Sequence, residues 1–197
     1  MKHNWKWVYN PFEKVAGWKA FGIGLIILCI TTVLGYFFKT VFYGISIKTV
    51  PCVTWSTAFS LQALGLGVLV FIMWIASLFF TKKVRFQDIL GTVTLAKYPL
   101  FFAVIPIMIF NNRMTEFTKK IMSVNVYEII KVITISDYVM LFAFSIIAFA
   151  IIIWEIVLLF NAFRVSTNLK GIKSAILFAS IMLASEITIL ILVSIIY

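Results

Sequence analysis

Apolar residues run through this 197-residue chain in long continuous stretches, and polar residues gather between them. A stretch of about 20 apolar residues is long enough to cross the hydrocarbon core of a bilayer as an α-helix. Apolar and polar residues do not alternate within the stretches, which excludes a strand barrel. The pattern predicts an all-α polytopic membrane protein with five transmembrane helices in one bundle, at Ala20–Phe38, Leu61–Phe80, Thr94–Phe110, Tyr138–Phe160 and Ser174–Tyr197.

The segment before the first span, Met1–Lys19, is predicted to lie at the cytoplasmic membrane interface, because it mixes lysines with tryptophans. Within it, Asn10, Pro11 and Glu13 stand in the pattern of a helix start. No cleavage site follows the first apolar run, so we expect that run to be retained and not removed as a signal peptide. The remaining residues, 20–197, are predicted to form the transmembrane domain.

Basic residues cluster at the ends of the apolar runs and set the expected orientation. With the N-terminus inside, eleven of the 17 lysines and arginines fall on the inner side, Lys97 among them, and six fall on the outer side. The N-terminus is therefore predicted to be cytoplasmic and Tyr197 to lie outside. The net charge of +10 then indicates contact with a bilayer that contains anionic lipids, and nucleic acid is not an expected partner.

The segment between the third and fourth spans, Asn111–Asp137, leaves two alternatives open. Apolar residues recur near helical spacing at Phe117, Ile121, Val124 and Ile129. This spacing is typical of an amphipathic helix that lies on the membrane surface. A short sixth span is the alternative, although the charged residues of the segment oppose it.

Glu155 and Glu186 are acidic residues inside predicted spans. A carboxylate at the centre of a membrane helix costs about 2.5–3.5 kcal/mol on insertion scales. Ala148 and Ala162 share a helical face with Glu155, and Ala179 shares one with Glu186. Because small residues let helices approach closely, both carboxylates are predicted to face other helices.

The two glutamates are expected at different depths. Glu186 falls near the middle of the membrane and Glu155 about 9 Å from the inner surface, at 1.5 Å per residue, so direct pairing is not predicted. Lys97 and Tyr98, at the inner start of the third span, are the predicted partners of Glu155. Glu186 is expected to be protonated and hydrogen-bonded, because desolvation disfavours its charged form. An ion or proton site and a polar clasp between helices both fit these residues.

Pro99 and Pro106 are predicted to interrupt the third span. Transporters use broken helices to expose backbone to a substrate, but ordinary membrane helices also tolerate proline. In the fifth span, Ser180, Ala184 and Thr188 form a stripe of small residues. Such a stripe is typical of close helix packing, within the chain or between copies.

Catalytic constellations of the kind found in soluble enzymes are not visible in the sequence. His3 is the only histidine, so neither a Ser/His/Asp or Cys/His site nor a histidine metal site is expected. The two cysteines, Cys29 and Cys52, offer neither a disulfide framework nor a metal-binding spacing. GxGxxG and GxxxxGK[ST] do not occur. We therefore expect no enzyme activity, no cofactor and no metal, and a membrane-embedded enzyme has the least support.

Residues 82–106 carry a family resemblance. The run KKVRFQDIL, followed by GTVTLAKYPLFFAVIP, resembles the bacterial branch of the Yip family, the Ypt/Rab-interacting membrane proteins. In that family a short cytoplasmic stretch after the second span leads into a third span with a proline near its start. Phe86, Gly91 and Pro99 are the matching positions, and the opening NPFEKVAGWKA is placed like the pre-membrane segment of the family. The resemblance implies five spans with a cytoplasmic N-terminus, in a bacterial inner membrane.

Eukaryotic Yip proteins resemble adaptors for vesicle traffic, which meet Rab-type GTPases through a long cytosolic tail. Here the tail is about nineteen residues and lacks a DLYGP-like motif, so Rab binding is not carried over. The resemblance implies a non-enzymatic scaffold or adaptor that acts with a membrane-protein partner or as a homo-oligomer. The alternative is a small permease or a proton- or ion-coupled transporter that uses the intramembrane glutamates.

Overall fold

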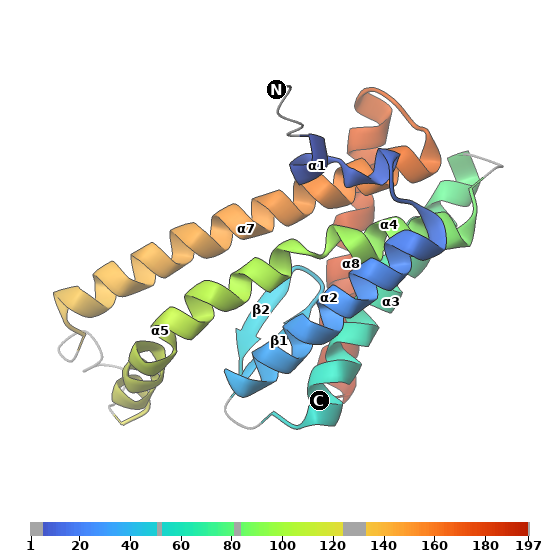
Figure 1. Ribbon diagram of the computed structural model, residues 1–197. Helices are drawn as coiled ribbons and strands as arrows, with labels where there is room; N and C mark the ends of the chain where they lie inside the picture. The colour runs from blue at the N-terminus through green and yellow to red at the C-terminus, as the bar shows by residue number, and fades with distance from the viewer. Residues whose placement is uncertain (1–5, 51–52, 81–83, 124–132, 197) are drawn as a thin grey trace.

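The computed structural model describes residues 6–50, 53–80, 84–123 and 133–196. Within these ranges five helical segments are long and apolar enough to cross a membrane, which confirms the predicted all-α bundle of five spans. The short helix α1 (Lys6–Tyr9) and the 3-10 turn η1 (Pro11–Glu13) precede the first span. They lie at one end of the molecule, and the C-terminal end of the last helix lies at the opposite end (Figure 1).

The spanning helices begin or end beyond the apolar stretches, because caps and not hydropathy decide where a helix stops. The fourth span, for example, begins at a capping box in which the Thr134 N–H donates to Asp137 (2.9 Å), and it ends at a left-handed Asn168. The helices are α2 (Gly17–Phe37), α3 (Trp55–Phe80), α4 (Phe86–Ala96), α5 (Pro99–Met122), α7 (Ile135–Thr167) and α8 (Ile172–Ile196).

The third span begins in a segment that the sequence assigned to the cytoplasmic loop. Residues 86–96 form α4, which packs against α2 and α7, and its second half is buried. Gly24 of α2 allows the close approach, because a methyl group there would meet the backbone of Thr94 and Leu95 at 2.6–2.8 Å. The predicted cytoplasmic position of this stretch is therefore wrong, and α4 and α5 together form one broken span.

The first half of the segment Asn111–Asp137 does not form a separate surface helix. Residues 111–122 continue α5, residues 135–137 begin α7, and residues 124–132 of the predicted segment lie outside the described residues. The predicted break at Pro106 is also wrong, because Pro106 lies inside α5. A proline removes one backbone donor, and a membrane helix that packs against its neighbours tolerates that loss.

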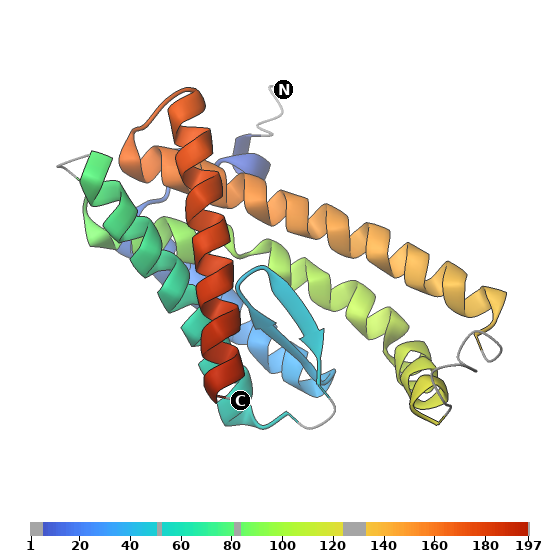
Figure 2. The ribbon, with the colours of Figure 1, turned by 180° about the vertical axis from the view of Figure 1, so that it is seen from behind.

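A β-hairpin occupies the segment between α2 and α3, where the sequence predicted only an outer loop. It consists of β1 (Thr40–Tyr43) and β2 (Ser46–Thr49), which pair antiparallel. The hairpin does not project from the bundle but turns back into it, where β1 contacts α2 and α3 (Figures 1 and 2). All residues of β1 are buried.

The tip of the hairpin, at Gly44 and Ile45, lies near the middle of the spanning helices. Its neighbour Gly65 is about 15 Å along α3 from Trp55, at 1.5 Å per residue, which is about half of a 30 Å hydrocarbon core. A methyl group at Gly65 would meet the Gly44 nitrogen at 2.5 Å, so this glycine makes room for the tip. Non-helical backbone at such a depth needs partners from the protein, because lipid offers none.

The N-terminal segment packs on α7. Phe12 is buried, and the Asn161 amide donates to the Tyr9 carbonyl (2.7 Å). The helix start predicted at Asn10 yields only η1, and the Asn10 side chain donates to Glu13 (3.1 Å) and caps no backbone N–H. A left-handed Gly17 then begins α2 separately. The interfacial location of this segment stays a prediction.

Candidate functional site

The third span is broken at Lys97 and Tyr98, between α4 and α5. The break lies at the first proline that the sequence singled out, because Pro99 has no N–H for a helical bond to Leu95. Tighter bonds bridge it, from the Tyr98 N–H to the Leu95 carbonyl and from the Leu100 N–H to the Lys97 carbonyl, both 3.1 Å. The turn places Lys97 inside the bundle with 1% of its surface exposed, so its predicted place among the inner-side charges is wrong.

Lys97 binds both the fourth span and the hairpin. Its ammonium donates to Oε1 of Glu155 on α7 (2.7 Å) and to the Gly44 carbonyl at the hairpin tip (2.5 Å). Glu155 is completely buried, in line with its predicted inward orientation. The structure thus brings together the two residues that the sequence paired, and their mutual attraction offsets part of the cost of burying each charge.

Glu186 of α8 holds the other side of the tip. Its Oε1 accepts the Ile45 N–H (2.9 Å), and its side chain is half-buried. It is hydrogen-bonded, as predicted, but to the hairpin and not to another helix. Gly44 has a φ of 57°, and a methyl group there would collide with the Glu186 carboxylate. Both the turn and this contact therefore require glycine at position 44.

These contacts form one connected unit, which joins the broken third span, α7, α8 and the hairpin. The two glutamates do not pair, because the tip lies between them. α7 continues to Thr167, about 18 Å beyond Glu155 at 1.5 Å per residue, and the shallow depth of Glu155 stays a prediction. We call the unit the hairpin clasp; it comprises the side chains of Lys97, Glu155 and Glu186 and the backbone of Gly44 and Ile45.

Tyr98 does not belong to the clasp, although the sequence offered it as a partner of Glu155. Its hydroxyl donates to the Val8 carbonyl (2.8 Å), which also accepts the Trp154 indole N–H (2.8 Å). The Tyr98 and Trp154 rings meet edge to face with centroids 5.1 Å apart. Lys97 and Tyr98 therefore point to different partners, and Tyr98 fixes the N-terminal segment on the bundle.

The clasp supplies the partners that the hairpin backbone needs in a bilayer. Within the clasp, Oε2 of Glu155 is buried without a hydrogen bond among the described atoms. No group of three or more His, Cys, Asp or Glu side chains in the described ranges could hold a metal ion. Three hollows open on the surface of the described residues, and no clasp side chain lines any of them.

Sequence reasoning missed Gly44 and Ile45, the backbone partners in the clasp. A signal was present, because β-branched and aromatic residues flank Gly44 and Ile45 on both sides, in TVFY before them and SIKT after them. Two such runs joined by a two-residue turn that begins with glycine indicate a β-hairpin.

No protein-family model, curated protein or solved structure matches this chain.

Proposed function

We propose that this integral membrane protein is a non-enzymatic scaffold or adaptor, which organises another membrane protein or a second copy of itself. The hairpin clasp is the observation that supports this proposal most. Its charged side chains are engaged with each other and with the hairpin backbone. Side chains that are bound in this way are not free to bind a transported ion. They therefore support a structural role for these residues over a role in transport.

The resemblance to the Yip family points to the same role, and its matching positions have packing functions in this structure. The Phe86 ring meets the Trp74 ring edge to face, with centroids 5.4 Å apart. A methyl group at Gly91 would collide with the Gly17 carbonyl. Pro99 sets the break that orients Lys97. These positions therefore support a Yip-like fold, and they do not point to a particular partner.

The surface of α8 supports a partner helix. Ser180 and Ala184 are exposed, so the chain does not use most of its small-residue stripe for its own packing. Thr188, the third residue of the stripe, is half-buried. Small residues on a lipid-facing surface let the backbone of another helix approach closely.

We propose a bacterial inner membrane with the N-terminus in the cytoplasm. With Lys97 inside the bundle, ten basic residues remain on the proposed inner side and six on the outer side. An excess of lysine and arginine in cytoplasmic loops is the rule for inner-membrane proteins.

Purification in native lipid discs, followed by mass spectrometry of the chains present, tests the scaffold role. A stoichiometric membrane-protein partner or a homo-oligomer is expected, and Ala184→Leu should weaken the complex by blocking close approach. Val157→Leu, at an exposed position on α7, is the matched control. A lone monomer in discs would contradict the proposal.

A small proton-coupled permease is the second candidate. The unpartnered Oε2 of Glu155 and the half-buried position of Glu186 favour it. If the protein is a permease, purified wild type moves solute across vesicles, and Glu186→Gln abolishes that flux while the protein stays folded. Vesicles that contain the wild-type protein and show no flux would argue against this candidate.

A further inference from the structure

A groove opens between the hairpin and α5, close to the end of α2. Its volume is about 330 Å³, at the lower end of the range of about 300–1,000 Å³ that is usual for small-molecule sites. One part of its wall is apolar and comes from two helices, α5 and α7, and from the turn after α2. These side chains are Phe38, Ile107, Met114 and Phe144.

The other part of the wall is polar. The charged side chains that line the groove are Lys39 and Lys119, and hydroxyl and amide groups lie beside them, from Thr40, Thr49, Asn111, Thr115 and Thr118. A second hollow of about 400 Å³ shares both lysines with the groove and adds the carboxylate of Glu116. Positive charge therefore exceeds negative charge where the two hollows meet.

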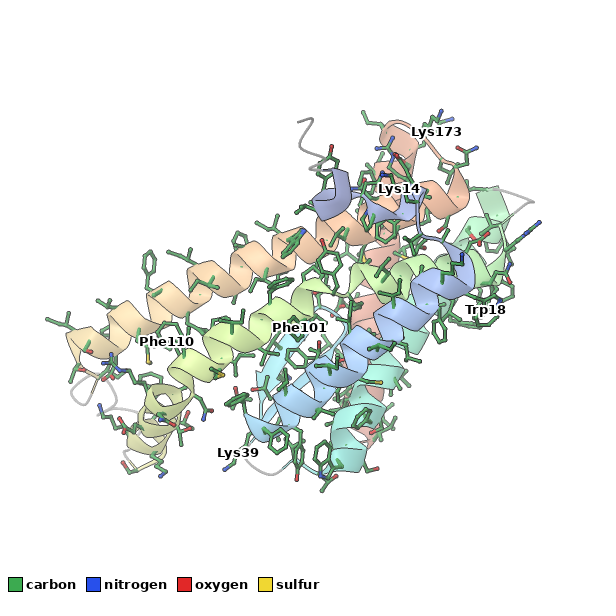
Figure 3. All side chains as sticks on the ribbon, in the orientation of Figure 1. Lys14, Trp18, Lys39, Phe101, Phe110 and Lys173 are labelled. Atoms are coloured by element: carbon green, nitrogen blue, oxygen red, sulfur yellow. The ribbon has the colours of Figure 1, made fainter. Side chains whose placement is uncertain are left out.

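Lys119 lies at the far end of the α5 residues that line the groove. Ile107 and Lys119 lie on the same helix about 18 Å apart, at 1.5 Å per residue, and Ile107 is nearer to the mid-span break at Lys97. Lys39 follows α2, at the end of the molecule opposite to Trp18 (Figure 3). Ile107 therefore lies toward the bilayer centre, and Lys39 and Lys119 lie toward the head-group layer.

We infer that this groove binds one phospholipid with an anionic head group. The lysines attract the phosphate, and one acyl chain lies against Ile107 and Phe144. Charge complementarity selects an anionic lipid, because each basic residue near the membrane surface raises affinity about fivefold. A small soluble anion would leave the apolar part of the groove in contact with water.

Lipid titration followed by native mass spectrometry tests this inference. Phosphatidylglycerol and phosphatidylcholine with identical acyl chains are compared on the full chain in detergent. Lys39→Gln with Lys119→Gln should lower the affinity for phosphatidylglycerol at least tenfold and leave phosphatidylcholine unchanged. The matched control is Lys48→Gln with Lys120→Gln, which removes equal charge at positions that do not line the groove. Equal losses in both double variants, or equal affinity of the wild type for both lipids, would overturn the inference.

Photo-crosslinking of the wild-type protein gives a second test, which does not depend on a variant that folds. Phosphatidylglycerol with a diazirine in its acyl chain is expected to label peptides that contain Met114 and Phe144. Leu183 and Ile187, which are exposed on α8, report labelling by bulk lipid. Equal yields on the groove peptides and on the α8 peptide would show that no lipid is held in the groove.

Discussion

Lys97→Met removes the only cation of the hairpin clasp and leaves Glu155 buried without its partner. Deleting one member of a buried ion pair costs about 3–5 kcal/mol. The Gly44 carbonyl also loses its donor, while Glu155 can relieve part of the loss by taking up a proton. We therefore expect Lys97→Met to lower the free energy of unfolding by about 3–5 kcal/mol.

The double variant Lys97→Met with Glu155→Leu separates the ion pair from the packing. Replacing a buried pair by apolar side chains of similar size is often neutral. What remains is the Gly44 carbonyl without a donor, which costs about 1–3 kcal/mol. The double variant is therefore expected to be more stable than either single variant.

Unfolding in mixed micelles with increasing dodecyl sulfate, followed by tryptophan fluorescence, measures these free energies. The matched control is the ion pair of Lys120 and Asp137 (3.4 Å), in which Lys120 is 43% exposed. Because exposed pairs contribute little, Lys120→Met should leave stability unchanged. A loss of stability in Lys97→Met as small as in Lys120→Met would show that the buried ion pair does not stabilise the bundle. The same conclusion would follow if the double variant lost the sum of the two single losses.

Three further predictions concern the hairpin and the orientation of the chain. Gly65→Ala should lower the free energy of unfolding by about 1–3 kcal/mol, because its methyl group meets the hairpin tip. Gly67 faces open space, so Gly67→Ala should not lower it in the same assay. Glu186→Leu should lower the free energy of unfolding by about 1–3 kcal/mol, because the Ile45 N–H loses its acceptor. Glu186→Gln keeps an acceptor and should lower it less, and equal losses in the two variants would contradict this. Lys39→Cys and Lys173→Cys, each in a variant without other cysteines, test the orientation in intact cells. An impermeant maleimide should label Lys39→Cys and not Lys173→Cys, and labelling of Lys173→Cys alone would show the opposite orientation.

The five spans and the contact of Lys97 with Glu155 could be predicted from the sequence because both follow from the cost of polar groups in lipid. An apolar run of sufficient length has few alternatives to a spanning helix. A buried carboxylate needs a partner, and Lys97 was the nearest cation in the expected bundle.

The helix ends and the effect of each proline were harder to predict. Hydropathy marks the lipid-facing part of a helix, whereas Thr134, Asp137 and Asn168 decide where α7 begins and ends. Pro99 breaks the third span and Pro106 does not, although both stand in apolar surroundings. At the first break Lys97 reaches the hairpin, a contact that the sequence does not display.

The hairpin itself was missed because its apolar content agrees with a short outer loop as well as with a buried strand pair. Lys48 falls in the segment and favoured the loop. Only the depth of Gly44, fixed by residues far away in the chain, distinguishes the two.

Hydrogen exchange of the wild-type protein in lipid discs tests the buried hairpin most directly. Mass spectrometry of the peptide that covers residues 40–49 follows its amides over time. We expect these amides to be protected like those of the spanning helices, because the clasp holds the hairpin inside the bundle, and we expect Lys97→Met to lose that protection. Exchange in the wild type at the rate of an open loop would contradict it.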